Sequence, residues 1–409
     1  MKYRQAEIGS VVTLRQGFAI NKNTKHHISE EPTDLPLLRI ADMKDGSQNV
    51  FVKDTIPPHF IAKSEDIIYT RTGQVGLVFT KQFGVIHNNC FTVTPNDEGV
   101  LSRKYLYYAL NNEDFYTKAN NLASGAAQPD LPHGAFKSIS IYLPPIGVQI
   151  RIVDILSAYD DLIENNQKQI KLLEEAVQRL YKEWFVDLRF PGYENTSIVN
   201  GVPQGWNRKK VVDCLSFHGN GGWGKEKPIG KNEHPGKVIR GTDIKDVKSG
   251  RFTEVPLRYH TDNDIAKRAL KSYDLVFELS NGNINNIGRC LLIDELILKN
   301  CGENTICASF CKLLRPIDPL HSLMLYLEIQ DMQTSGRMLP LKKHGANGIN
   351  NFDFDGFLNH ALLVPDSTKL IKPINEIMKE ISIIQGKITL LTEARDRVLP
   401  KLMSGEIEV

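Results

Sequence analysis

The feature that most constrains this chain is a heptad pattern that occurs twice, with matching positions 218 residues apart. In the first copy the seam positions are Ile152, Leu156, Tyr159, Ile163, Asn166, Ile170, Leu173, Val177, Leu180 and Trp184. In the second copy they are Leu370, Ile374, Ile377, Ile381, Ile384, Ile388, Leu391, Arg395, Val398 and Leu402. Only Asn166 and Arg395 are neither apolar nor aromatic, and the pattern predicts two long helices that pair with each other. Asn166 either fixes the register of the pair at some cost in stability or faces solvent.

The segments that precede the two helices also match each other. In the first segment the strand candidates are 35–40, 66–70, 76–80, 90–94 and 139–143, and the helix candidate is 103–111. Five stretches of this segment recur in the same order, namely 6–11, 39–45, 64–69, 105–110 and 141–145. Their counterparts are 210–215, 240–246, 272–277, 324–329 and 361–365. The chain is therefore predicted to be an internal duplication of the α+β class.

The predicted order along the chain is domain, helix, domain, helix. The boundaries fall at 1–144, 145–190, 191–364 and 365–409. A helix of about 35–40 residues is roughly 55–60 Å long, so the first helix carries the chain away from the first domain and the second must return. We therefore expect an antiparallel coiled-coil pair with one domain at each end, related by an approximate two-fold axis.

Composition places the chain among globular proteins of two or more domains. Of its 409 residues 41% are hydrophobic and 24% charged, and no apolar run approaches the roughly 18 residues that span a bilayer. The first residues lead into no apolar stretch, and the six cysteines form no C-x-x-C pair. We therefore expect a cytoplasmic protein with reduced thiols and with no metal or cofactor. Because the net charge is only +2, a nucleic-acid binder of this composition must gather its cations locally.

Two similar domains held a fixed distance apart suit a ligand that repeats along a line, such as duplex DNA. A two-fold protein matches half-sites separated by whole turns of about 34–36 Å. Because the loops of the two domains differ, the two half-sites should differ in sequence. Along essentially its whole length the chain also resembles the specificity subunits of type I restriction–modification systems. The stretches that carry this resemblance are 66–73 with Gly76, 124–131, 143–145 with Gln149, 203–206 and 399–406.

This resemblance implies two target-recognition domains, each of which reads one half of an asymmetric bipartite DNA site. It implies that methylation and cleavage belong to partner subunits, namely two modification (methyltransferase) subunits that dock near the helices, with or without motor–nuclease restriction subunits. The chain itself would then not be an enzyme, and we identify no catalytic residues. The second copy departs from the family pattern at 281–285 and 347–351, so contact residues are not transferred between the halves. The alternative is a structural scaffold that clamps two protein partners without nucleic acid.

Candidate DNA contacts in the first domain lie in loops next to strands. Arg71 has the fork geometry that suits guanine, Gln74 suits an adenine edge, and Thr72 suits either kind of base. Arg71 could instead have a structural role, such as pairing with Asp66. The other candidates are Asn88, Asn89 and Gln128, and the two asparagines could equally satisfy a turn.

Candidate contacts in the second domain form two short groups. Asn281, Asn283 and Asn285 are amides that could meet base edges, although such residues also favour tight turns. Lys342, Lys343 and His344 form a compact basic group that suits phosphate contacts or a solvated loop. His26 and His27 of the first domain are expected to be loop residues and not metal ligands.

Two further features concern the helix ends and a Gly-rich stretch. Candidate partner contacts near the helix ends are Tyr181, Phe185, Val186, Leu399 and Met403, and the alternative is that these side chains cap the protein's own core. The stretch 219–226 fits a nucleotide-binding P-loop as far as Lys225, but Glu226 stands where a Ser or Thr should hold magnesium. We interpret this stretch as a recognition loop or surface loop in preference to a nucleotide-hydrolysing site.

Overall fold

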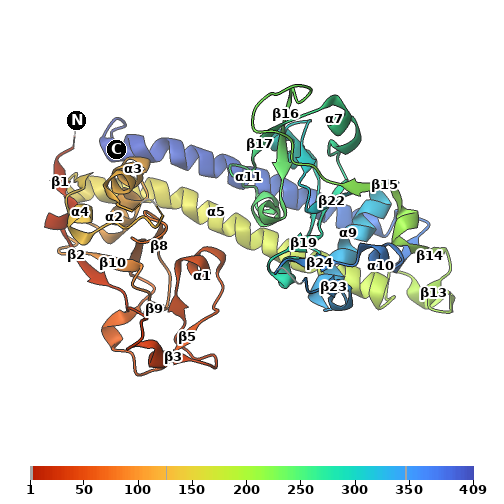
Figure 1. Ribbon diagram of the computed structural model, residues 1–409, viewed down its shortest axis with the longest axis horizontal. Coiled ribbons are helices and arrows are strands. Elements are labelled where there is room, and N and C mark those ends of the chain that lie inside the picture. The colour runs from red at the N-terminus through yellow and green to blue at the C-terminus, as the bar shows by residue number, and fades with distance from the viewer. Residues whose placement is uncertain (1–2, 126, 346–347) are drawn as a thin grey trace. The chain divides into compact units, whose positions relative to one another are not determined.

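The computed structural model describes residues 3–125, 127–345 and 348–409. Ala126 and Asn347, which belong to two loop stretches discussed above, lie outside the described residues. The chain divides into two compact units, Met1–Asp161 with Thr392–Val409, and Leu162–Leu391. Two long helices, α5 (Ile146–Tyr181) and α11 (Ile371–Ser404), each contribute to both units (Figure 1). We call the rest of each unit its head.

The first head is built on a four-stranded antiparallel sheet. The strand order is β2 (Val12–Gln16), β10 (Cys90–Pro95), β7 (Ile67–Thr70) and β8 (Val78–Phe79). A second sheet contains β4 (Leu37–Leu38), β9 (Gly84–Ile86) and β6 (Ile61–Ala62), with β4 and β9 parallel. Two further antiparallel pairs join β1 (Gln5–Glu7) to β11 (Ser140–Tyr142) and β3 (Ile28–Ser29) to β5 (Phe51–Val52). The helices of this head are α1 (Ile40–Asp45), α2 (Arg103–Leu110), α3 (Glu113–Leu122) and α4 (His133–Lys137).

The second head repeats this plan and adds elements to it. Its four-stranded sheet has the order β15 (Leu215–Asn220), β22 (Cys311–Pro316), β18 (Leu275–Glu278) and β20 (Cys290–Leu292). The second sheet contains β17 (Leu257–His260), β16 (His234–Ile239) and β21 (Ile306–Cys307), with β16 and β21 parallel. Further strands are β14 (Trp206–Lys210) with β25 (Ala361–Pro365), β12 (Ile198–Val199) with β13 (Val202–Pro203), and β19 (Ser280–Asn281), β24 (Asn350–Phe352) and β23 (Lys342–Lys343). The helices are α6 (Ile244–Lys248), α7 (Asp262–Arg268), α8 (Glu295–Cys301), α9 (Pro319–Thr334) and α10 (Phe354–Leu358).

The predicted duplication is confirmed down to local contacts. Arg39 pairs with Asp42 at the start of α1, and Arg240 pairs with Asp243 immediately before α6, each at 2.6 Å. The strand expected over 35–40 is shortened to Leu37–Leu38, because α1 already begins at Ile40. Burial alone would raise the pKa of Asp42, but hydrogen bonds from Arg39 and other neighbours outweigh burial and lower it. The Arg39–Asp42 pair stabilises the start of this short helix. The helix therefore takes the place of the last residues of the expected strand.

The two long helices pair in opposite directions within each unit. In the first unit Asp160 contacts Arg395 at 2.7 Å, and the Arg151 guanidinium donates to the carbonyl oxygen of Val409 at 2.9 Å. Arg151 comes before Asp160 in α5, whereas Val409 comes after Arg395 and just beyond the end of α11. Residue numbers therefore rise along α5 as they fall along α11, so the two helices are antiparallel here. In the second unit the end of α5 shares its core with the start of α11. All twenty predicted seam positions are buried or half-buried, including Asn166.

The charged seam residue Arg395 is matched by a carboxylate within the first unit. Asp160 accepts from Arg395 and also from the Tyr108 hydroxyl at 2.6 Å. Burial and then the hydrogen bond to Asp160 raise the pKa of Tyr108, so the hydroxyl keeps its proton. The one guanidinium in the seam therefore joins α5, α11 and α2 through a single carboxylate. Within the described residues, no helix combines the length and the apolar character needed to cross a membrane.

Candidate nucleic-acid interface

In the first head three loops that are far apart in sequence meet at one end of the central sheet. These loops are 71–76, 87–89 and 123–131 without residue 126, and we call their meeting place the first loop edge. The Arg71 amide donates to the carbonyl of Asn89 at 2.8 Å, and the Leu131 amide donates to the carbonyl of Arg71 at 2.9 Å. The Gly73 amide donates to the carbonyl of Pro129 at 2.8 Å. Backbone hydrogen bonds therefore bring together the candidate residues that the sequence left scattered.

Arg71 links different parts of the first loop edge through the hydrogen bonds of its guanidinium group. Its Nη2 donates to Asp130 at 2.7 Å, its Nε donates to the same carboxylate at 3.2 Å, and its Nη1 donates to Gln16 at 3.3 Å. The Thr72 hydroxyl also donates to Asp130, at 2.5 Å. The Arg71 hydrogen bond is the main reason why the pKa of Asp130 is lowered. The alternative structural role of Arg71 is thus present, but its partner is Asp130 and not Asp66, because Asp66 pairs with Arg15 at 2.9 Å.

The remaining candidates of the first loop edge differ in exposure. Gln74 and Gln128 are exposed, whereas Asn88 and Asn89 are half-buried. The carbonyl oxygen of Asn88 accepts from the Gln16 amide at 2.5 Å, and that of Asn89 accepts from the loop that contains Arg71. The two asparagines therefore serve a turn through their backbone, while the side chains of the two glutamines are exposed to a ligand.

The second head has a loop edge at the equivalent place, formed by 279–289, 308–310 and 342–351 without residues 346 and 347. The Leu279 amide donates to the carbonyl of Phe310 at 3.0 Å, as Arg71 does to Asn89. In the first head isolated antiparallel β-bridges join the backbone of Asp130 to that of Thr72 and to that of Ser124. In the second head the same positions form the three-stranded sheet β19–β24–β23 (Figure 1). The second loop edge is therefore a more extensively paired version of the first.

The asparagines of the second loop edge form a chain of turns. The Asn281 side chain donates to Glu278 at 2.7 Å and accepts from the Asn283 amide at 2.7 Å. The Asn283 side chain in turn accepts from the Asn285 amide at 3.0 Å. These contacts are the turn role that the sequence left open. Asn283 and Asn285 are exposed and Asn281 is half-buried, so donor groups of the first two remain accessible.

The basic group of the second loop edge is partly neutralised by its neighbours. Lys343 pairs with Asp353 at 3.1 Å, and His344 contacts Asn350 at 3.1 Å. Lys342 donates to Gln333 at 3.4 Å, and burial lowers the pKa of Lys342. Of the three, Lys343 and His344 are exposed. They are the members of the group that are available to a phosphate.

The Gly-rich stretch 219–226 has a role in the fold. The Gly221 amide donates to the carbonyl of Cys311 at 3.0 Å, just as the Gly17 amide donates to the carbonyl of Cys90 at 3.1 Å. A Cβ atom on Gly221 would overlap the carbonyl oxygen of Ala308. The Lys225 amide donates to the carbonyl of Tyr259 at 2.9 Å, and the two residues form an isolated antiparallel β-bridge. Lys225 therefore does not stand at the start of a helix. These contacts favour the loop interpretation over nucleotide binding.

Sequence analysis missed an exposed aromatic residue at the second loop edge. Phe310 has 64% of its surface exposed, and it directly precedes Cys311 as Asn89 precedes Cys90. Matching the two cysteines between the copies would have found this position. Trp223, another partly exposed aromatic residue, lies under the Arg258 guanidinium at 4.8 Å. The side chain of Trp223 is therefore already engaged by a cation.

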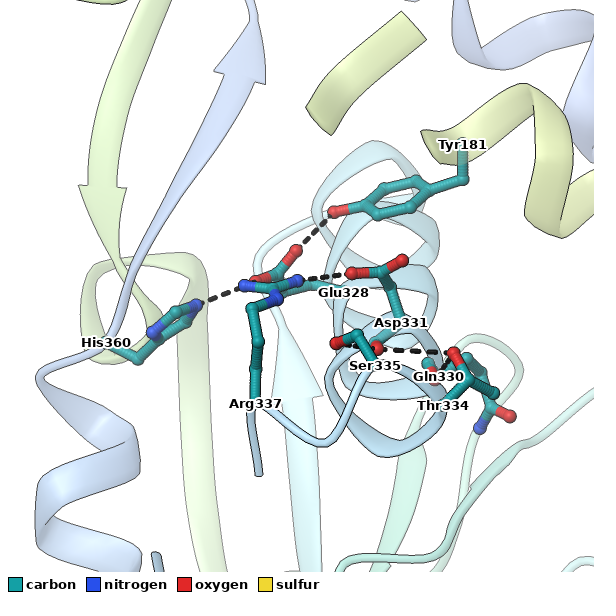
Figure 2. Close-up of polar contacts among 8 residues, drawn as sticks. All are labelled: Tyr181, Glu328, Gln330, Asp331, Thr334, Ser335, Arg337 and His360. Atoms are coloured by element: carbon teal, nitrogen blue, oxygen red, sulfur yellow. Dashed lines mark hydrogen bonds and ion pairs between the residues drawn. The ribbon is translucent and has the colours of Figure 1, made fainter. Parts of the chain in front are cut away.

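Four of the five candidate partner contacts at the helix ends are buried in the chain's own cores. Tyr181 and Phe185 belong to the core of the second unit, and Leu399 and Met403 belong to that of the first. Val186 alone of the five is exposed. The Tyr181 hydroxyl donates to Glu328 at 2.7 Å (Figure 2), which ties the end of α5 to α9. These contacts support the alternative in which such residues cap the protein's own core.

Glu328 is the centre of a buried polar network in the second unit (Figure 2). His360 contacts Glu328 at 2.7 Å, and Arg337 donates to it at 2.9 Å while also pairing with Asp331 at 2.5 Å. Burial alone would raise the pKa of Glu328, but hydrogen bonds from His360, Arg337 and Tyr181 outweigh burial and lower it to about 2. The network is structural, because Tyr181, Arg337 and His360 all contact the buried carboxylate of Glu328, which Arg337 reaches from the surface.

Within the described residues, no group of three or more His, Cys, Asp or Glu side chains is arranged to hold a metal ion. All six cysteines are free and buried. Burial raises the pKa of each of Cys90 and Cys307 to about 12. The thiols therefore behave as small apolar core residues.

Comparisons with known proteins agree with this duplicated architecture. Residues 2–175 match the family model described as the type I restriction modification DNA specificity domain. The type I restriction enzyme MjaIX specificity subunit of Methanocaldococcus jannaschii is 24% identical over 391 residues, which cover 90% of this chain and 81% of that protein. The EcoKI specificity subunit of Escherichia coli is 20% identical over 432 residues, which cover 98% and 88%. The crystal structure of the S subunit of a type I restriction–modification system from M. genitalium has the same fold, with a TM-score of 0.53, 15% identity and coverage of 98% and 96%. Residues 2–175 therefore match this family, and over most of its length the chain is similar to type I restriction–modification specificity subunits.

Proposed function

We propose that this chain is the non-catalytic DNA-recognition subunit of a type I restriction–modification complex and that each head reads one half of an asymmetric bipartite site. The observation that carries the proposal is the pair of equivalent loop edges. Each edge is fixed to the end of a four-stranded sheet by the same backbone hydrogen bonds, and each carries different side chains. A shared frame with different exposed groups suits two readers of two different sequences.

The exposed groups of each loop edge have the chemistry that base edges require. Gln74 and Gln128 in the first head carry amides that can pair with an adenine edge. In the second head Asn283 and Asn285 offer amides beside the cations of Lys343 and His344. Arg71 would position the first loop edge through Asp130 and would contact DNA only with donors left over from that pair. We place methylation and cleavage in partner subunits and the complex in the cytoplasm.

The long helices would set the gap between the two half-sites and would receive the modification subunits. Apolar side chains that lie outside the seam are exposed on both helices, namely Leu162, Leu172, Ile383 and Leu390. Such residues are better candidates for docking a helical partner surface than the buried Tyr181 or Met403. We propose that two modification subunits bind along these flanks.

The recognition proposal is tested by sequencing the methylated adenines of cells that carry this chain with its modification subunits. The expected result is one bipartite motif with two unlike halves. If binding selection from a randomised duplex library enriches no sequence when the modification subunits are present, a protein scaffold without nucleic acid becomes the better explanation. Binding should also weaken steeply as salt rises, because phosphate contacts release counterions.

The spacing role has its own test, which is the insertion of one heptad into each long helix at matched seam positions. Seven residues lengthen a helix by roughly 10 Å, which corresponds to about three base pairs of duplex. The expected motif keeps both half-site sequences and changes the gap. Altered bases within either half would contradict a spacer role, while insertion into one helix alone serves as a control that should disrupt the pairing.

A further inference from the structure

A four-residue turn has the same backbone frame in both heads and carries different side chains at its tip. In the first head the Cys90 amide donates to the carbonyl of His87 at 2.9 Å. In the second head the Cys311 amide donates to the carbonyl of Ala308 at 2.8 Å. Both cysteines are fully buried and accept from the glycines described above. The two turns are therefore held in the same way at the same place.

The residue that precedes the anchoring cysteine differs in character between the turns. Asn89 is half-buried, whereas Phe310 is 64% exposed. Full burial of a phenylalanine side chain stabilises a protein by about 1.5–3 kcal/mol. Because most of the Phe310 side chain is exposed, the free protein lacks most of this stabilisation. A single exposed apolar residue is common on protein surfaces, so its surroundings must decide what it does.

Phe310 lies beside the candidate DNA-contacting groups of the second loop edge. Its carbonyl accepts from Leu279, and the chain then enters β19, which ends at Asn281. β19 pairs with β24, so that Asn281 lies opposite Asn350, and Ile349 immediately before it is 48% exposed. Exposed apolar surface from Phe310 and Ile349 thus lies at the same loop edge as the exposed amides of Asn283 and Asn285. In the major groove an A·T pair presents the adenine pattern that amides read and the thymine methyl group that apolar side chains cover.

We propose that Phe310 is a specificity-determining residue of the second head and that its ring covers the C5-methyl group of a thymine in the second half-site. This inference rests on the proposed DNA-recognition function. The second head would then recognise a base through an apolar contact at this position. The first head has the polar residue Asn89 at the equivalent position.

The test uses the full chain in complex with its modification subunits and the duplex motif that the wild-type complex selects. Each thymine of the second half-site is replaced in turn by deoxyuridine, which removes only the methyl group. At one position the wild-type complex should bind about fourfold more weakly, the effect expected for losing one buried methyl contact. The Phe310→Ala complex should bind the thymine duplex more weakly than wild type and should no longer distinguish thymine from deoxyuridine there.

Phe83→Ala is the matched control, because Phe83 is also an exposed phenylalanine, at 57%, and lies in the first head. It should leave the methyl dependence of the second half-site unchanged. A methyl effect that persists in the Phe310→Ala complex would overturn the inference, as would a second half-site without any methyl-dependent thymine. If the wild-type complex selects no sequence at all, the proposed function itself fails, which is a distinguishable result. Thermal unfolding of Phe310→Ala checks that its fold is intact, and a Phe310→Leu variant should retain part of the discrimination.

Discussion

Replacing Glu328 with glutamine should destabilise the second unit in a pH-dependent way. The Glu328 side chain is almost fully buried and accepts hydrogen bonds from Tyr181, Arg337 and His360. These contacts hold its pKa at about 2, against an ordinary value of 4.5. At about 1.4 kcal/mol for each tenfold change, this difference corresponds to roughly 3 kcal/mol of stabilisation. Glu328→Gln keeps the shape of the side chain but loses the charge that Arg337 and His360 surround.

The sign of the pH dependence follows from the lowered pKa of Glu328. A carboxyl group with a lower pKa in the folded state stabilises the fold fully above its unfolded pKa of 4.5, and this stabilisation is lost as the pH falls toward 2. The difference in unfolding free energy between wild type and Glu328→Gln should therefore be about 3 kcal/mol at pH 7. By pH 3 it should have decreased by about 2 kcal/mol.

Tryptophan fluorescence during urea unfolding is a suitable assay for this prediction. All three tryptophans, Trp184, Trp206 and Trp223, belong to the second unit, so their emission follows the part of the chain that contains Glu328. Glu376→Gln is a matched control, because Glu376 forms an exposed pair with Lys379, and loss of an exposed pair should leave the free energy of unfolding nearly unchanged. A difference between wild type and Glu328→Gln that stays constant from pH 7 to pH 3 would refute the reasoning.

Three further perturbations test other parts of the chain. Arg395→Ala leaves Asp160 half-buried without its ion-pair partner, so thermal unfolding should show the first unit destabilised by about 1–2 kcal/mol; an unchanged melting temperature would argue against the pairing. Gly221→Ala places a Cβ against the carbonyl of Ala308 and should lower the yield of folded protein or cost at least about 2 kcal/mol, which urea unfolding would measure. Burial raises the pKa of Cys90 to about 12, so alkylation of this thiol at pH 8 should require unfolding of the first unit, and mass spectrometry of alkylated peptides would detect any faster reaction.

The periodic parts of the fold could be predicted from the sequence because their signal is repeated many times. Each heptad pattern has ten seam positions, nine of them within the long helix itself, and a single mismatch such as Arg395 does not hide the pattern. The duplication was detectable for the same reason, since five short stretches recur in order. The direction of pairing followed from chain connectivity, and contacts such as Asp160 with Arg395 agree with it.

Contacts between loops could not be predicted because no periodicity links their members. Arg71 and Asp130 are 59 residues apart and join only because the backbone of one loop bonds to that of another. Sequence reasoning offered the nearer Asp66 as an example of a structural partner, but Asp66, which directly precedes β7, is already paired with Arg15. The residue types correctly located the loop edges, whereas the division between structural and exposed side chains depended on coordinates.

The duplication also separates the residues that hold each loop edge from those that a ligand would meet. Gly17 and Gly221 serve the same close backbone approach, and Cys90 and Cys311 receive the same hydrogen bonds. Substitution at these frame positions meets a backbone atom or a filled core, so their identity is constrained by packing. Tip residues such as Phe310 contribute their carbonyl to the frame but leave the side chain free. A change of side chain at a tip therefore alters the chemistry offered to a ligand without altering a contact that the fold requires, which is what the proposed reading of two different half-sites would need.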